Sequence, residues 1–261
     1  MSRTSRLVIV TQRPQAERKS RMQHKVVSPD EWLVARRALL AKEKECTRLQ
    51  DELNAARREL PWVKVEKEYI FDTPQGKRTL GELFDGRSQL YLYHFMFAPD
   101  WKQGCSGCSF YCDHVDGANQ HIKHHDVTFV AVARAPLAQI EAYKKRMGWR
   151  FNWVSSYGSD FNYDFHVSFT KDQIAKGEAT YNFEPYKGEM EDLHGTSVFF
   201  KDAEGAIYHT YSAYARGDER SLGTYMWLDI SPKGRNEGEG GNLTNWVKRH
   251  DQYDEAPKAA E

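Results

Sequence analysis

The chain has 261 residues, of which 37 are Lys or Arg and 37 are Asp or Glu, so its formal net charge is zero. This balance disfavours a protein that binds nucleic acid or an anionic membrane through its overall charge. Aromatic residues are frequent, with 13 Phe, 14 Tyr and 7 Trp, and they supply apolar surface for a sizeable core. No segment approaches the ~18–20 uncharged apolar residues that a membrane helix needs. The composition predicts a soluble globular protein.

The N-terminal segment is basic, and its apolar run Leu7–Val10 is too short for the core of a signal peptide. We expect residues 1–27 to be a disordered leader, with translation starting at Met1 or at Met22. The chain has four cysteines, too few and too unevenly spread for a disulfide-stapled secreted scaffold. We therefore expect a cytoplasmic protein.

A long helix is predicted over residues 28–62. Ser28 and Glu31 form a capping box, and Pro29 takes the first helical position, where its missing N–H costs nothing. An apolar stripe follows at a spacing of 7-3-4-3-4 residues: Leu39, Cys46, Leu49, Leu53, Ala56 and Leu60. The helix is longer than one globular face requires, so we expect it either to wrap the following domain or to pair with a second copy in a homodimer. Cys46 is expected to be a small buried residue of this stripe.

The middle of the chain predicts an α/β domain over residues 63–232, followed by a loop and tail over 233–261. Segments 89–97 and 127–133 are apolar on both alternating faces, which is typical of buried strands. A helix between them implies a right-handed parallel crossover, so we expect a mixed sheet flanked by helices. Further expected elements are a hairpin over 71–83, a helix over 136–147, a short strand near 153–154, an aromatic-rich insertion over 155–186, a hairpin of 196–201 with 206–211, and a helix over 219–229.

A Cys-x-x-Cys motif, Cys105 and Cys108, lies between the first buried strand and the next helix. Beside a βαβ pattern in a reducing compartment, this context is typical of a thioredoxin-like redox motif. The helix N-terminus favours thiolate over thiol, so Cys105 is the expected attacking residue. Cys108 lies one turn inward and is the expected resolving residue. Cys112 is either an alternative resolving thiol or a packed core residue.

A metal site is the rival interpretation of the cysteine cluster. Zinc would need a fourth ligand, with candidates His114, His121, His124 and His125. The chain has no second Cys-x-x-Cys and no spaced His pair, and the ferredoxin pattern needs another cysteine. We therefore expect neither a metal nor another cofactor. An inactive cysteine pair is the third alternative.

Three further residues are candidates for supporting roles near the thiols. Arg134 ends the second buried strand and would stabilise a Cys105 thiolate if it projects from the same sheet edge. His94 is either a buried proton acceptor beneath the cysteines or a core histidine. Trp101 is either a wall beside the thiol or a packing residue. The aromatic side chains between Trp149 and Phe165 are expected to pack over the core, with a substrate groove as the alternative.

Four stretches carry a resemblance to a known family: FMFAPDWKQGCSGCSF (95–110), VAVARAPLAQIEAYKKRMGW (130–149), SSYGSDFNYDFHVSF (155–169) and TYSAYARG (210–217). Together they resemble an uncharacterised bacterial family of unknown function with a thioredoxin-like fold and a Cys-x-x-Cys motif, distantly similar to thioredoxins and peroxiredoxins. The resemblance covers residues 23 to 253 and implies that fold. It implies thiol–disulfide or peroxidase-like chemistry by analogy of fold.

The chain departs from both better-known groups. Thioredoxins place Trp before the first cysteine and a proline before the late hairpin, whereas this chain has Gly104 and the stretch 194–197 without proline. Ala98 and Lys102 replace the Pro and Thr or Ser of the peroxiredoxin pattern. The leading hypothesis is a thiol–disulfide oxidoreductase acting on a small-molecule or protein disulfide, with reduction of a peroxide through sulfenic acid as a variant. The alternative is a non-catalytic thioredoxin-like module that binds a metal or a partner and self-associates through its long helix.

Overall fold

The computed structural model describes residues 24–235 and 246–253. The chain forms two units, residues 1–56 and 57–261, and each is considered by itself. Most of the expected leader, residues 1–23, lies outside the described residues, as does much of the expected C-terminal loop and tail. The boundaries predicted for the leader, helix, domain and tail therefore stay predictions.

The long N-terminal helix is present as α1 (Pro29–Arg58). Its capping box forms as predicted, because the Ser28 backbone N–H donates to Glu31 Oε2 at 3.0 Å and the Glu31 N–H donates to Ser28 Oγ at 3.3 Å. Leucines of the apolar stripe of α1 are exposed: Leu49 is 59% exposed and Leu53 is 48% exposed. Cys46 is exposed as well, so the prediction of a buried cysteine is wrong for the single chain.

An eight-stranded mixed sheet forms the centre of the second unit, in the order β1-β10-β9-β4-β5-β6-β2-β3. Strands β4, β5 and β6 are parallel neighbours, and β9 pairs with the other side of β4 in the antiparallel sense. The strands are β1 (Val63–Lys64), β2 (Ile70–Thr73), β3 (Gly76–Thr79), β4 (Gln89–His94), β5 (Val127–Ala133), β6 (Asn152–Ser155), β9 (Gly195–Lys201) and β10 (Ile207–Tyr214). This is the thioredoxin-like mixed sheet that the resemblance implies, so the predicted fold class is confirmed.

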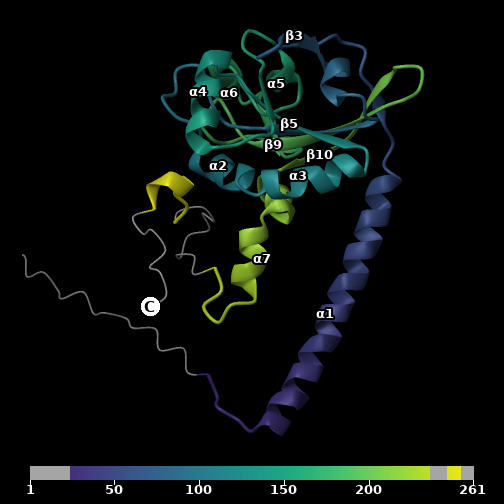
Figure 1. Ribbon diagram of the computed structural model, residues 1–261, viewed down its shortest axis with the longest axis vertical. Helices are drawn as coiled ribbons and strands as arrows, with labels where there is room; N and C mark the ends of the chain where they lie inside the picture. Colours follow the sequence, from purple (N-terminus) through teal and green to yellow (C-terminus); the bar gives the residue numbers. More distant parts are fainter. Residues whose placement is uncertain (1–23, 236–245, 254–261) are drawn as a thin grey trace, which may run out of the picture. The chain divides into compact units, whose positions relative to one another are not determined.

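Helices cover both faces of this sheet, and Figure 1 shows α2 and α3 on one side with α5 on the other. The helical segments are η1 (Leu80–Phe84), α2 (Ser106–Cys112), α3 (Val115–His124), α4 (Leu137–Met147), α5 (Phe161–Asp164), α6 (Lys171–Lys176), η2 (Ala215–Ser221), α7 (Gly223–Asp229) and η3 (His250–Gln252). The helix expected after the cysteines is divided into α2 and α3, and the one expected over 219–229 is divided between η2 and α7. Among the described helices, none has the length and apolar content to cross a bilayer.

Alternation along the strands separates the core into two clusters. Tyr93 and Ala131 point to a cluster that includes α2, α4 and α7 residues, whereas Leu92 and Val132 point to a cluster with η1 and α5. Successive strand residues face opposite sides of a sheet, so both strands are buried on both faces. The doubly buried strands expected over 89–97 and 127–133 are thereby explained, although β4 ends at His94.

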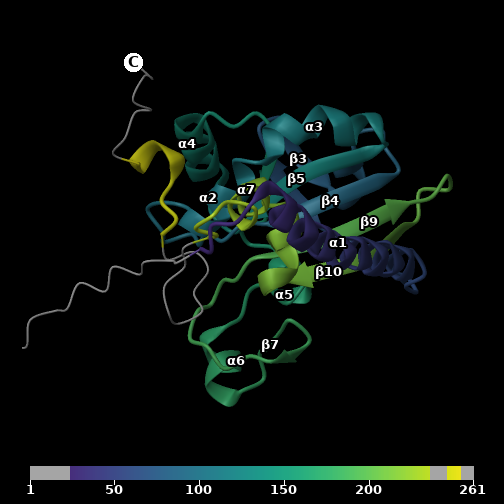
Figure 2. The ribbon, with the colours of Figure 1, turned by 90° about the horizontal axis from the view of Figure 1, so that it is seen from below.

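The aromatic-rich segment between β6 and β9 contains α5, α6 and a small hairpin, β7 (Thr180–Tyr181) with β8 (Glu184–Pro185). Figure 2 shows α6 and β7 together, to one side of the large sheet. Phe161 is fully buried and Phe165 nearly so, whereas Tyr157 is exposed. Most aromatic side chains from Trp149 to Phe165 therefore pack in the core, as expected, and none of them lines the pocket beside the cysteines.

Candidate functional site

Cys105 and Cys108 lie where β4 leads into α2. Cys105 is the residue that precedes the first turn of α2, and its backbone N–H donates to the Met96 carbonyl at 3.1 Å. Cys108 is buried one turn further on, and the Met96 N–H donates to its sulfur at 3.4 Å. Both cysteines are thus hydrogen-bonded to the backbone of Met96, which fixes the loop between β4 and α2. Cys105 remains partly exposed.

Gly104 allows this loop to pass close to the core. A Cβ atom at this position would lie 2.5 Å from the Phe95 ring and 3.1 Å from the Tyr143 ring. The tryptophan that thioredoxins carry at this point has no space here. The Gly104 carbonyl accepts hydrogen bonds from the Arg249 guanidinium.

The pKa values of the two thiols are shifted in opposite directions. The Cys108 thiol, which donates a hydrogen bond to the Cys105 sulfur, is the main cause that lowers the pKa of Cys105 to about 6. The backbone N–H groups of Cys108 and Gly107 and the positive charge of Arg249 act in the same direction, against burial, which raises it. Burial raises the pKa of Cys108 well above its ordinary value. Near neutral pH this pair is a thiolate beside a protonated thiol, which suits nucleophilic attack by Cys105.

Arg249 places a positive charge near Cys105. Its guanidinium donates to the Gly104 carbonyl, with Nε at 3.1 Å, and to the Tyr143 hydroxyl at 2.8 Å. Sequence reasoning missed this residue because it lies in the segment expected to be a loop and tail. A single arginine far from the motif in sequence gave no signal of its position.

Arg134 does not take the role considered for it. Its guanidinium forms a bidentate pair with Asp192, at 2.7 Å and 2.5 Å, and donates to the Tyr163 hydroxyl. The Ser168 hydroxyl donates to the same carboxylate at 2.7 Å. Arg134 does follow β5 as expected, but its guanidinium binds Asp192 and Tyr163 of the segment between β6 and β9 and so holds this segment onto the sheet.

His94 lies on the opposite face of β4 from the cysteine helix. Its Nε2 is 2.9 Å from Ser197 Oγ, and its ring stacks on Phe161 and Phe165. Burial lowers the pKa of His94 to about 3, so the ring is neutral. This is the core-histidine alternative, and the structure does not bring His94 beneath the cysteines.

The remaining candidates have packing positions. Cys112 is fully buried in the same cluster as Cys108, and burial raises the pKa of its thiol well above the ordinary value. Trp101 packs against this cluster while partly exposed. His114 contacts the Phe110 carbonyl at 2.7 Å and Thr224 Oγ1 at 2.8 Å, away from the sulfur atoms. Among residues 24–235 and 246–253, no three His, Cys, Asp or Glu side chains converge as a metal site.

Both Cys105 and Cys108 line a pocket of about 620 Å³. Its walls come mainly from β4, α2, the segment before β9, and η2 with α7. Apolar residues predominate, and the polar groups of the lining include Asp218 and His194. Sequence reasoning missed both residues: Asp218 follows directly after the quoted stretch 210–217, and His194 belongs to the stretch noted only for its lack of proline.

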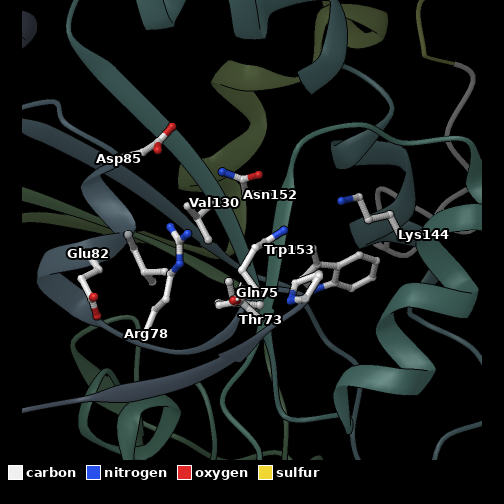
Figure 3. Close-up of a pocket in the computed structure, with 12 residues that line it drawn as sticks. Thr73, Gln75, Arg78, Glu82, Asp85, Val130, Lys144, Asn152 and Trp153 are labelled. Carbon is white, nitrogen blue, oxygen red and sulfur yellow. Dashed lines mark hydrogen bonds between the residues drawn. The ribbon is translucent and has the colours of Figure 1, made fainter.

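A second pocket, of about 370 Å³, lies on the β2–β3 side of the sheet and has no cysteine in its lining. Figure 3 shows Lys144 of α4 across this pocket from Arg78 and Glu82. Glu82 is already engaged in the cap of η1, where it accepts from the Thr79 N–H at 2.7 Å. The pocket with the thiols is therefore the candidate active site.

Comparisons with known proteins give a family and several solved structures of low similarity, and they assign no activity. No curated protein matches the chain. Among solved structures, the chain is similar to peroxidoxin BcpB from Mycobacterium tuberculosis, at 12% identity and a TM-score of 0.43, covering 63% of this chain and 95% of that one. It is also similar to a PrxQ mutant from Xylella fastidiosa, at 12% identity and a TM-score of 0.39, covering 61% and 88%.

The bacterioferritin comigratory protein of Xanthomonas campestris gives 12% identity and a TM-score of 0.38, covering 59% of this chain and 86% of that one. Similarity of this extent does not assign a reaction. The family model described as bacterial protein of unknown function (DUF899) matches residues 21–253, including both cysteines and the whole pocket. The chain belongs to this bacterial family.

Proposed function

We propose that the protein is a thiol–disulfide oxidoreductase in which Cys105 attacks and Cys108 resolves. The observation that carries the proposal is the pairing of a partly exposed, low-pKa Cys105 with a buried, high-pKa Cys108 in one pocket. A thiolate is the reacting form in exchange, and a resolving thiol that stays protonated does not compete for the substrate.

The reaction proceeds in two exchanges. The Cys105 thiolate attacks one sulfur of the substrate disulfide, the substrate S–S bond breaks, and the first substrate thiolate leaves. Cys108 then loses its proton and attacks Cys105 Sγ of the mixed disulfide, which releases the second thiolate. The protein dithiol is oxidised to a disulfide, and the substrate disulfide is reduced to two thiols.

A peroxide substrate would enter at the same sulfur. The Cys105 thiolate would attack one peroxide oxygen, the O–O bond would break, and the other oxygen would leave as alkoxide or hydroxide and take up a proton. Condensation of the resulting sulfenic acid with Cys108 would form the same disulfide and release water. The peroxide reaction uses the same two cysteines as the disulfide reaction, so one experiment can test both substrates.

The test is rapid alkylation and peptide mass mapping of the four cysteines in the full chain, across graded thiol/disulfide buffers and after peroxide. We expect a reversible Cys105–Cys108 disulfide that is lost in Cys105→Ser, while Cys108→Ser traps a mixed disulfide on Cys105. Cys46→Ser is the matched control, since it removes an exposed thiol outside the site. If both thiols stay reduced across the range, the oxidoreductase proposal fails and the non-catalytic module takes its place.

We further propose a cytoplasmic location and a homodimer. All four cysteines are unpaired, which suits a reducing compartment. The exposed leucine stripe of α1 is the surface we assign to self-association, because a helix of this length with an uncovered apolar stripe gains stability by pairing.

A further inference from the structure

A buried carboxyl group lies in the pocket without a hydrogen-bond partner. Asp218 is 5% exposed, and no hydrogen bond of good geometry reaches either carboxylate oxygen within residues 24–235 and 246–253, although the neighbouring Thr196 hydroxyl acts to lower the pKa of Asp218. The nearest base is His194, whose Nε2 is 3.8 Å from Asp218 Oδ2. Buried polar groups are almost always satisfied in folded proteins, so an unsatisfied carboxyl facing a cavity indicates a missing donor.

The surrounding side chains do not provide a positive charge for Asp218. Burial lowers the pKa of His194, which keeps this ring neutral. Besides the Thr196 hydroxyl, the groups near the carboxyl include the phenols of Tyr91, Tyr93 and Tyr181, whose pKa values are raised by burial. Burial raises the pKa of Asp218 to about 7, so above this pH Asp218 is ionised and, together with the Cys105 thiolate, makes the interior of the pocket negative.

The charged residues at the pocket rim are already paired with one another. Arg216 Nε is 2.8 Å from Glu219 Oε1, and Arg235 Nη1 is 3.1 Å from Glu219 Oε2. Glu219 therefore pairs with two arginines, Arg216 of the pocket lining and Arg235. A cationic group of a ligand could therefore meet Asp218 inside the pocket.

The rest of the wall suits a carbon chain. Apolar side chains line it: Met96, Phe110, Met190, Leu193, Leu222 and Tyr225. Its volume, about 620 Å³, lies within the range of small-molecule pockets, ~300–1,000 Å³. A ligand with an apolar body and one cationic donor would satisfy both parts of the surface.

We infer that the pocket binds a small aliphatic disulfide that carries an ammonium group, with Asp218 as the residue that recognises the amine. The inference rests on the proposed function, because the same molecule presents its disulfide to Cys105. Exchange consumes one substrate disulfide and the protein dithiol, and yields two aminothiols and the Cys105–Cys108 disulfide. Carboxylate disulfides are disfavoured, because above pH 7 they would add a negative charge beside the ionised Asp218 and the Cys105 thiolate.

Binding can be tested apart from chemistry with carbon analogues that have no disulfide. Calorimetry of the reduced full chain with 1,6-diaminohexane, hexane-1,6-diol and adipate compares a cation, a neutral donor and an anion of one length. We expect the diamine to bind about tenfold or more tightly than the diol, as a charged hydrogen bond predicts, and adipate to bind most weakly. The difference between diamine and diol should vanish in Asp218→Asn and persist in Glu204→Gln, which removes an exposed carboxylate elsewhere.

The exchange reaction is then measured with the matching disulfides, cystamine, bis(2-hydroxyethyl) disulfide and dithiodiglycolate, with each rate divided by that of a free thiol. Preference for cystamine that is lost in Asp218→Asn supports the inference. Equal binding of the three analogues, or a diamine preference unchanged in Asp218→Asn, overturns it even when all three disulfides oxidise the cysteines. Diamine binding through Asp218 without oxidation by any disulfide supports the amine site and overturns the proposed exchange function.

Discussion

The Arg249 guanidinium binds the backbone carbonyl of Gly104, the residue directly before the attacking cysteine, although the two are 145 positions apart in sequence. The contact fixes the loop that carries Cys105 and places a positive charge near its sulfur. The C-terminal part of the chain thus contributes directly to the electrostatics of the candidate site.

Removing this charge should raise the pKa of Cys105. In the wild-type protein we expect the alkylation rate of Cys105 to rise with pH around a midpoint of about 6. Arg249→Met should move this midpoint upward by a few tenths to about one unit, since one of several stabilising contacts is lost. The control is Arg150→Met, which removes a cation that is 83% exposed and 3.6 Å from Asp116. An unchanged midpoint in Arg249→Met would contradict the assigned charge.

Arg134 should matter for stability rather than for the thiolate. Arg134→Met leaves the Asp192 carboxylate, whose side chain is 6% exposed, with no cation beside it. We expect a loss of about 3–5 kcal/mol in the free energy of unfolding, because one partner of a buried pair has been removed. The alkylation midpoint of Cys105 should stay the same in the folded variant. A midpoint that rises with this substitution would restore the role considered from sequence.

Asp218 should make the protein less stable as pH rises. Burial raises the pKa of Asp218 from 3.8 to about 7, so the folded state retains a proton that the unfolded state releases. Stability should therefore fall as pH rises from about 4 to 7, by at most about 4 kcal/mol at ~1.4 kcal/mol for each pKa unit.

Urea unfolding of Asp218→Asn and the wild type, at several pH values between 4 and 8, isolates this contribution. The variant should gain relative stability as pH rises, and the gain should level off above the folded-state pKa. A difference between the two proteins that does not change with pH would exclude a raised pKa.

The homodimer should depend on the leucine stripe of α1. Leu49 and Leu53 are large apolar residues with about half their surface exposed. We expect Leu49→Glu/Leu53→Glu to convert a dimer into a monomer in sedimentation equilibrium at tens of micromolar. Ala41→Glu/Thr47→Glu adds the same charge to exposed positions outside the stripe and should leave the dimer intact. A wild-type monomer at these concentrations would exclude the dimer.

The sequence supported the prediction of the strands and the cysteine pair because these features are local. The continuous apolar run over 127–133 matches β5, and the capping box at Ser28 begins α1 where expected. Leu90 and Leu92 share the face of His94, whereas Met96 lies in the opposite cluster because the chain leaves the strand after His94.

The contacts around the thiols depend on distant segments and had no local signal. Arg249 reaches Gly104 from the C-terminal part of the chain, and Asp218 enters the pocket from the turn after β10. Arg134 lies at the expected sheet edge, yet Asp192 captures its guanidinium. The partner of a long side chain depends on tertiary packing. A local sequence pattern therefore does not predict it.

Because Gly104 lies close to Phe95, the residues that fit at positions 104 and 95 depend on each other. A side chain introduced at position 104 alone would collide with the Phe95 ring 2.5 Å away. We expect a tryptophan before Cys105 to become tolerable only with a much smaller residue at position 95. Exchange of the residue before the first cysteine, a simple way to alter a redox loop, here requires two coordinated substitutions.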